Sequence, residues 1–155
     1  MPLVEPGRKA PAFALPDQDG ETHRLRDYAG RPLILYFYPK DDTPGCTREA
    51  CAFRDALPQF KKGRAAVLGV SVLDTASKAR FARKHELNFP LLADPDHAVA
   101  DKYGAWQKKS LYGRTYMGVA RMTYLIGPDA KVVRRWDSVK VDRHAAEVLQ
   151  AVDAL

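Results

Sequence analysis

Cysteine is scarce in this chain. Only Cys46 and Cys51 occur among its 155 residues, of which 46% are hydrophobic. A chain of this length buries roughly two thirds of the surface that its unfolded form exposes, so it needs no disulfide to stabilise a core. Two cysteines are also too few for a disulfide scaffold. A disulfide between them would therefore serve a function rather than the fold.

Long apolar runs, linkers and repeats are missing as well. No segment approaches the length of a membrane span, and residues 1–10 carry Glu5, Arg8 and Lys9 where a signal peptide has an apolar region. We expect a cytoplasmic protein, in a compartment that keeps thiols reduced. Because no low-complexity tract or internal repeat interrupts the sequence, we also expect one domain over residues 1–155.

The chain has no basic arm either. It carries 25 Lys and Arg against 19 Asp and Glu, a net charge of +6. The basic residues include scattered pairs at 61–62, 108–109 and 134–135, with acidic residues between them. Such a pattern is typical of a solvated surface, and no nucleic-acid-binding motif accompanies it. We therefore expect neither a nucleic acid nor a membrane as a partner.

Apolar patterning predicts alternating strands and helices. Residues 33–38 form a continuous apolar run, typical of a strand covered on both faces. From Cys46 onward, Ala50, Phe53 and Phe60 recur at helical spacing. Further strands are expected at 65–72, 91–93, 119–126 and 131–136, helices at 74–85, 94–103 and 142–152, and a hairpin at 13–15 and 22–25. This order predicts an α/β, thioredoxin-like fold, with a mixed central sheet flanked by helices and an added N-terminal hairpin.

Cys46 follows a predicted strand and opens a predicted helix, a position that activates a thiol. Only the thiolate attacks, and a thiol with the ordinary pKa near 8.5 is only about 3% ionised at pH 7. Unpaired N–H groups and the positive end of the helix dipole favour the charged form. Pro39 and Pro44 rigidify the loop, and Thr43 adds a hydroxyl that can hydrogen-bond a substrate oxygen. The alternatives are an inert, buried Cys46 and a Thr43 that only caps the helix.

Cys51 lies five positions after Cys46. On an intact helix this spacing separates the two Cα atoms by about 8.6 Å. A disulfide tolerates less than about 7 Å, so the first turns of the helix must unwind if the two sulfurs are to join. Alternatively, Cys51 packs in the core beside Leu33 or Phe53. A zinc site is disfavoured, because two thiolates lack two further ligands and the histidines show no pairing pattern.

The residues around Cys46 resemble a known family. They read Pro39-Lys40-Asp41-Asp42-Thr43-Pro44-Gly45-Cys46 and fit the peroxiredoxin signature of proline, three residues, threonine, two residues and cysteine. Extended to residues 36–51, the run resembles the Q-type subfamily, also called bacterioferritin comigratory proteins. Further likeness lies at 14–20, 88–94 and 109–113, so the resemblance covers nearly the whole chain.

The resemblance implies a role for each residue that matches. Cys46 would be the peroxidatic nucleophile and Cys51 the resolving thiol, while Thr43 would hydrogen-bond the peroxide and Pro39 would shield the site from water.

Two charged residues complete the implied site. Arg121 matches the family's active-site arginine, and Glu49, three residues after Cys46, matches the acidic residue that orients it. Without this match, Arg121 would be interpreted as a surface residue and Glu49 as an ordinary carboxylate in the first turn of a helix.

The implied activity is the thiol-dependent reduction of hydrogen peroxide and organic hydroperoxides. Cys46 would become a sulfenic acid, form an intramolecular disulfide with Cys51 and be restored by thioredoxin or a similar dithiol protein. The resemblance implies no cofactor and no metal, and we expect a monomer or a weak dimer. One alternative is a thiol–disulfide oxidoreductase on the same fold, although such enzymes place two residues between their cysteines and this chain has four. The other is a non-enzymatic redox sensor in which the disulfide switches a surface.

Overall fold

The structure, a computed structural model, describes residues 2–155, so Met1 of the predicted domain lies outside it. Its elements follow in this order: β1 (Ala14–Pro16), β2 (Thr22–Arg24), the 3-10 helix η1 (Leu25–Tyr28), β3 (Leu33–Phe37), α1 (Pro44–Lys62), β4 (Ala66–Ser71), α2 (Thr75–Lys84), β5 (Leu91–Ala93), α3 (Ala98–Lys102), β6 (Trp106–Leu111), β7 (Arg114–Val119), β8 (Met122–Ile126), β9 (Val132–Trp136) and α4 (His144–Asp153).

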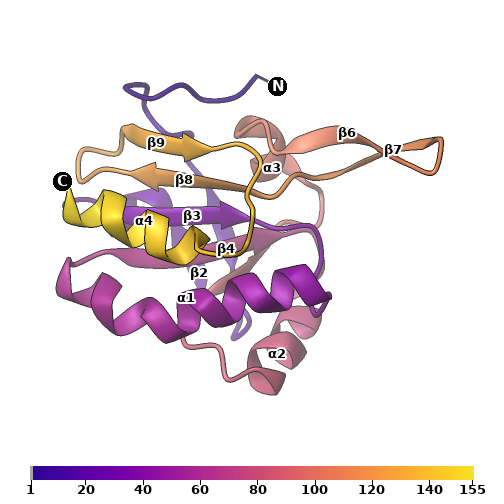
Figure 1. The fold of residues 1–155 in the computed structure, drawn as a ribbon, viewed down its shortest axis with the longest axis horizontal. Helices are drawn as coiled ribbons and strands as arrows, with labels where there is room; N and C mark the ends of the chain where they lie inside the picture. Colours follow the sequence, from indigo (N-terminus) through magenta and orange to yellow (C-terminus); the bar gives the residue numbers. More distant parts are fainter. Residues whose placement is uncertain (1) are drawn as a thin grey trace.

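A five-stranded sheet in the order β5-β4-β3-β8-β9 forms the centre of the molecule (Figure 1). Strands β3, β4 and β5 are parallel, whereas β8 runs antiparallel to β3 and β9 runs antiparallel to β8. Parallel neighbours need a crossover connection, which α1 supplies between β3 and β4 and α2 supplies between β4 and β5. The prediction of a mixed sheet flanked by helices is confirmed.

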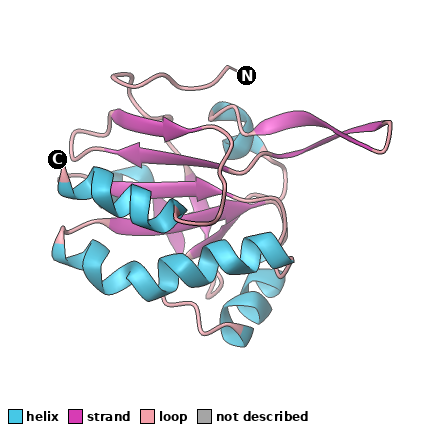
Figure 2. Cartoon of the chain, viewed as in Figure 1, coloured by secondary structure: helices cyan, strands magenta, loops and turns pink. Residues whose placement is uncertain are grey.

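Strand β3 is buried on both of its faces. Leu33, Leu35 and Phe37 belong to a core cluster with the N-terminal segment and α3. Ile34 and Tyr36 belong to a second cluster with α1, α2 and α4. Figure 2 shows α1 and α4 side by side over this second face of the sheet. The two-sided burial explains why the sequence of β3 is apolar without alternation.

Several further predictions are confirmed. The N-terminal hairpin forms from β1 and β2, which pair antiparallel. Helix α1 begins at Pro44, a first-turn position that suits proline because its missing N–H has no partner within a helix. Strands β4, β5 and β9 and helix α2 lie within one or two residues of their expected ranges.

The strand expected at 119–126 is present as β8, but it begins three residues later than predicted. Val119 ends β7 and Met122 begins β8, and these two strands belong to different sheets. Ala120 lies between them and donates its N–H to the carbonyl of Ala105 at 2.7 Å, outside either ladder. The antiparallel hairpin β6–β7 was not predicted, because its strands are largely exposed and lack an alternating apolar pattern.

Helices α3 and α4 begin later than expected. The residues before them, His97 and Arg143, have φ angles of 51° and 68°. This left-handed conformation cannot continue into a right-handed helix, so α3 starts at Ala98 rather than at 94 and α4 starts at His144 rather than at 142.

Candidate active site around Cys46

Cys46 is the third residue of α1, just after the loop that follows the carboxyl end of β3. Its side chain is 1% exposed and joins the core cluster between the sheet and α1. The first helical hydrogen bond of α1 runs from the Thr47 N–H to the Thr43 carbonyl at 2.8 Å. The helix itself therefore leaves the N–H groups of Gly45 and Cys46 unused, at the positive end of its dipole.

Arg121 joins Cys46 to Glu49. It lies between β7 and β8, and its Nη2 donates a hydrogen bond to Cys46 Sγ at 3.3 Å. Its Nη1 donates to Glu49 Oε1 at 2.8 Å. One planar guanidinium thus contacts the sulfur and the carboxylate with separate nitrogens. The structure brings together three residues that the sequence separates by up to 75 positions.

Glu49 is 2% exposed, and only one of its two oxygens has a protein partner. Burial raises the pKa of this carboxyl to about 7, although the charge and the hydrogen bond of Arg121 act in the opposite direction. The group is therefore close to its titration midpoint at neutral pH, which is unusual for a glutamate.

Gly45 permits the close approach of Arg121. A Cβ atom at this position would lie 3.1 Å from Arg121 Nη2 and 3.7 Å from its Cζ. A side chain at position 45 would therefore crowd the guanidinium, and Arg121 would have to shift by a few tenths of an ångström to keep its place at the start of α1.

Thr43 and Pro39 lie in the loop between β3 and α1. Thr43 precedes the first turn of α1, but its hydroxyl accepts no capping hydrogen bond and instead donates to the Lys40 carbonyl at 3.2 Å. Thr43 is thus the N-cap residue of α1, as the alternative expected, but its side chain does not cap the helix. Pro39 is half-buried, two residues after the end of β3.

A buried polar network anchors the same loop, and it was not predicted from the sequence. Asp41 accepts hydrogen bonds from the Tyr38 hydroxyl at 2.6 Å and from the Ser77 hydroxyl at 2.7 Å. The ammonium of Lys78 lies 3.3 Å from both Asp41 oxygens and donates to Ser71 Oγ at 2.6 Å. Lys78 is 0% exposed, and burial lowers its pKa while Asp41 opposes this shift. The network ties the loop to α2 and β4.

Lys109 and Tyr36 also lie near the site. Burial and then the charge of Arg121 lower the pKa of the Lys109 ammonium, while Cys46 acts in the opposite direction. The stem of Lys109 packs across Gly118 in the β6–β7 hairpin. The hydroxyl of Tyr36 is buried without a protein partner, and burial, followed by Glu49 and Cys46, raises its pKa. Sequence patterning gave no signal for either residue, since tyrosine in an apolar run and paired lysines are common.

Cys51 lies on the same helix as Cys46 but apart from the cluster. Both cysteines are free thiols, and α1 is continuous through both. Helix geometry then keeps their Cα atoms about 8.6 Å apart. Cys51 is half-buried and belongs to neither core cluster, so the alternative of a core partner for Leu33 or Phe53 is wrong.

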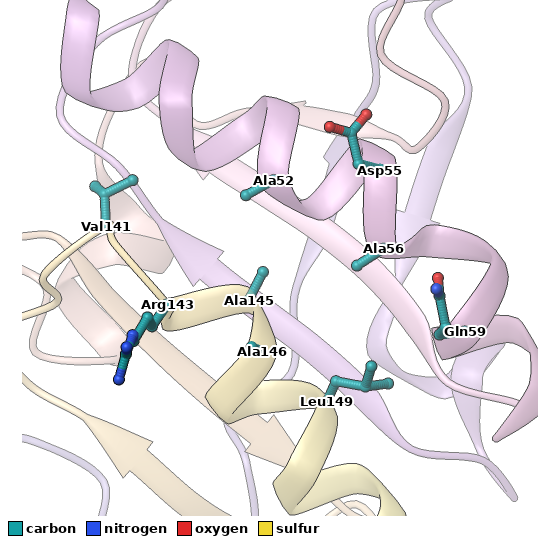
Figure 3. Close-up of a pocket in the computed structure, with 9 residues that line it drawn as sticks. All are labelled: Ala52, Asp55, Ala56, Gln59, Val141, Arg143, Ala145, Ala146 and Leu149. Atoms are coloured by element: carbon teal, nitrogen blue, oxygen red, sulfur yellow. The ribbon is translucent and has the colours of Figure 1, made fainter.

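A groove of about 380 Å³ lies elsewhere, between α1 and α4 (Figure 3). Its walls include Ala52 and Ala56 of α1 and Ala145 and Leu149 of α4. The site residues Cys46, Arg121 and Glu49 do not line it. The groove therefore lies beside the second half of α1 and the start of α4, away from the sulfur of Cys46.

Within residues 2–155, one group of side chains has the spacing of a metal site, namely Asp17, Glu21 and His23. Its atoms are already engaged, because His23 binds Asp17 at 2.7 Å through Nε2 and the Tyr28 hydroxyl at 2.6 Å through Nδ1. Neither cysteine takes part. Across the same residues, no helix combines the length and the apolar character that crossing a bilayer requires.

A thioredoxin-like sheet with a cysteine at a helix start and an arginine on its sulfur defines a class of protein, the thiol peroxidases. Comparisons with known proteins give the family. The model of the AhpC/TSA family matches residues 6–135, and the chain belongs to this family of peroxiredoxins. The resemblance seen in the sequence is thereby confirmed.

Individual relatives agree over almost their full lengths. A putative peroxiredoxin Bcp from Coxiella burnetii is 46% identical over 146 residues, which cover 94% of this chain and 97% of that protein. Peroxiredoxin Bcp from Bacillus subtilis is 44% identical over 149 residues, covering 96% of this chain and 95% of that protein.

Solved structures show the same fold. A mutant of Xylella fastidiosa PrxQ superposes with a TM-score of 0.94 at 35% identity, covering 99% of this chain and 98% of that one. The Xanthomonas campestris bacterioferritin comigratory protein, described by its alkyl peroxide reduction activity, gives a TM-score of 0.91 at 38% identity, covering 97% of this chain and 98% of that one.

Proposed function

We propose that this peroxiredoxin reduces hydrogen peroxide and alkyl hydroperoxides with Cys46 as the attacking atom. The observation that carries the proposal is the hydrogen bond from Arg121 Nη2 to Cys46 Sγ at 3.3 Å, supported on its far side by Glu49 at 2.8 Å. The guanidinium places a positive charge beside the sulfur, and the reactive form of a cysteine is its thiolate. The Xanthomonas campestris relative, described by alkyl peroxide reduction, supports the choice of substrate class.

The first step is an in-line displacement. The Cys46 sulfur attacks the distal oxygen of the hydroperoxide, an S–O bond forms, and the O–O bond breaks. Negative charge then develops on the departing alkoxide, which takes up a proton and leaves as an alcohol or as water. Arg121 and the unused N–H of Cys46 are donors that can stabilise that charge. We assign the Thr43 hydroxyl, which now donates to Lys40, to the same task once a substrate oxygen is present.

Pro39 and Glu49 support this step without touching the reacting atoms. Pro39 removes one N–H and is half-buried at the end of β3, where it limits access of water to the sulfur. Glu49 is buried and holds one edge of the guanidinium, which leaves the other edge directed at Cys46. We infer that Glu49 fixes the orientation of Arg121.

Cys51 would complete the cycle. Its thiol attacks the sulfenic acid on Cys46, a disulfide forms and water leaves. The spacing on α1 requires residues 44–51 to unwind first. Phe53, Leu57 and Phe60 lie in the core cluster that α4 shares, and this packing would hold the rest of the helix in place. A thioredoxin-type dithiol protein would then return both thiols by disulfide exchange, and one copy of the chain contains every residue needed.

The test is turnover of hydrogen peroxide and of an alkyl hydroperoxide, coupled to a thioredoxin system, with wild type, Cys46→Ser and Cys51→Ser. We expect Cys46→Ser to consume neither peroxide. Cys51→Ser should react once and then stop with thioredoxin as reductant. Turnover by Cys46→Ser would refute the proposal. Reduction of insulin disulfides without consumption of peroxide would identify a thiol–disulfide oxidoreductase instead.

A further inference from the structure

The β6–β7 hairpin carries most of the exposed apolar side chains of the molecule. Among residues 2–155, six large apolar residues are exposed, and four of them lie on this hairpin: Leu111 (56%), Tyr112 (98%), Tyr116 (46%) and Met117 (49%). The hairpin projects away from the central sheet, with its turn at the far end (Figure 1). Exposed apolar side chains gathered in one place mark an interaction surface.

All charged residues of the same hairpin are positive. No aspartate or glutamate occurs between Asp101 and Asp129, whereas the hairpin contains Lys108, Lys109 and Arg114. Within residues 2–155, no salt bridge joins these three cations to a carboxylate.

Cations and apolar groups lie opposite each other across the two strands. Lys108 is opposite Met117, and Leu111 is opposite Arg114. Both faces of the hairpin therefore combine positive charge with apolar area, and its tip presents Leu111 and Tyr112 together. Aromatic and aliphatic groups flanked by lysine and arginine are the combination that binds the interface of an anionic bilayer.

We propose that the β6–β7 hairpin docks the protein on the surface of an anionic lipid bilayer. Leu111 and Tyr112 enter the interface, and Lys108 and Arg114 contact lipid phosphates. This partner differs from the expectation drawn from the sequence, because the hairpin that creates the surface was not predicted. A second copy of the chain is a poorer occupant, since two hairpins of like charge repel each other.

Docking would hold the base of the hairpin, and with it the candidate active site, on the side of the molecule that faces the bilayer. Arg121 follows β7 by two residues, and Lys109 on β6 lies close enough for Arg121 to shift its pKa. The start of α1 is at the same end of the central sheet as the base of the hairpin (Figure 1). Resting on the proposed function, we assign phospholipid hydroperoxides to this site. The Cys46 thiolate would take the distal oxygen, and the lipid would leave as the corresponding alcohol after taking up a proton.

Binding is measured first, without peroxide, by flotation with vesicles of phosphatidylcholine alone or mixed with phosphatidylglycerol. We expect wild type to float with the anionic vesicles and to dissociate as salt rises. Each cation near an anionic surface strengthens binding about fivefold, so Lys108→Gln with Arg114→Gln should weaken it about 25-fold. Leu111→Ser with Tyr112→Ser should weaken it on both kinds of vesicle.

Matched variants control for composition. Lys61→Gln with Lys62→Gln removes the same charge from the exposed end of α1, and Val133→Ser removes an exposed apolar group from β9. Both should bind vesicles as wild type does. If the control variants lost as much binding as the hairpin variants, the hairpin would not be the docking surface. Absence of wild-type binding to anionic vesicles would overturn the proposal outright.

Activity then separates this proposal from the proposed function. All of these variants should reduce hydrogen peroxide in solution at the wild-type rate. The hairpin variants alone should reduce phosphatidylcholine hydroperoxide in anionic vesicles more slowly than wild type does. Vesicle binding without any peroxidase activity would refute the proposed function and leave the docking surface in place. If the hairpin variants instead lost turnover with thioredoxin in the absence of vesicles, or lost self-association, the hairpin would bind a protein and not a membrane.

Discussion

Arg121 is the residue on which the geometry of the site depends most. Its side chain contacts Cys46 and Glu49 at once, and Gly45 leaves it room to do so. A lysine would retain the positive charge, but a single ammonium lacks the two separate edges of a guanidinium.

We therefore predict that Arg121→Lys slows the reaction with hydrogen peroxide about 10- to 100-fold. The loss of one charge-assisted hydrogen bond, about 1.5–3 kcal/mol, corresponds to this range. Stopped-flow measurement of the second-order rate constant tests the prediction, with unfolding monitored to show that the fold is intact. Arg134→Lys, at an exposed position of β9, is the control. A rate equal to that of wild type would remove Arg121 from the reaction.

For single residues, the sequence alone identified members of the site only where they are close together along the chain. Cys46, Thr43 and Pro39 could be identified because their chemistry lies in one contiguous run. Arg121 and Glu49 are 72 positions apart, and only the family resemblance connected them. Lys78 and Asp41 were missed because lysine and aspartate are rarely buried, so no local pattern signals such a pair.

Lys78 anchors the loop between β3 and α1 through Asp41. Its ammonium, together with Tyr38 and Ser77, satisfies the buried carboxylate of Asp41. Removing one partner of a buried ion pair leaves an uncompensated charge.

We predict that Lys78→Met lowers the free energy of unfolding by about 3 kcal/mol and slows peroxide reduction, because the loop that carries Pro39 and Thr43 loosens. Urea unfolding and stopped-flow rates measure the two effects. The control is Lys84→Met on the same helix, which breaks an exposed contact to Asp42 and should cost less than about 1 kcal/mol. Equal stability of the two variants would show that the network does not anchor the loop.

The proposed cycle requires α1 in two states, one with free thiols and one with a Cys46–Cys51 disulfide. In the reduced state it runs unbroken through Cys46 and Cys51, and a disulfide between them is incompatible with that geometry. Cys46 and Ala50 in the first turns belong to the same core cluster as Val148 of α4, so unwinding would have to take these turns out of the core.

We predict that oxidation by one equivalent of peroxide increases amide hydrogen exchange in residues 47–51 while residues 52–62 stay protected. Exchange followed by mass spectrometry of peptides covers both segments. Cys51→Ser cannot form the disulfide and should keep its protection. If oxidised wild type retained a protected first turn, local unwinding would not be part of the cycle.

The sequence predicted elements well where burial was simple. Strand β3 is covered on both faces and α1 on one, so an apolar run and helical spacing identified them. The β6–β7 hairpin has no such signature, because most of its side chains face solvent. The prediction therefore assigned Val119, the last residue of β7, to the strand that became β8, and it missed the projecting, basic surface.

The stability of the whole molecule should depend on pH through two buried groups of opposite behaviour. His144 binds Thr123, and burial, followed by the charges of Arg121 and Arg134, lowers its pKa to about 4. The free energy of unfolding therefore falls as pH falls from 6.5 towards 4, because His144 binds a proton in the unfolded state but stays neutral in the folded state. Glu49, with its pKa raised to about 7, contributes stability that is present below 4.5 and lost as pH rises to 7.

Between pH 6.5 and 4.5 the two effects oppose each other. We predict that Glu49→Gln removes the contribution of the carboxyl and leaves that of His144. The unfolding free energy of the variant should then fall more steeply with falling pH than that of wild type, and the two slopes should differ by up to about 1.4 kcal/mol per pH unit. Urea unfolding at a series of pH values gives both curves. Glu147→Gln, at an exposed position of α4, should follow wild type. Parallel curves for wild type and Glu49→Gln would show that burial does not perturb this carboxyl.

The central claim is that the sulfur of Cys46 removes oxygen from a hydroperoxide. The most direct measurement mixes Cys51→Ser with one equivalent of hydrogen peroxide and determines the mass of the peptide that contains Cys46. We predict a gain of one oxygen atom on that peptide, at the rate at which peroxide disappears, and a Cys46–Cys51 disulfide in wild type under the same conditions. Consumption of peroxide with the Cys46 peptide unchanged would contradict the claim.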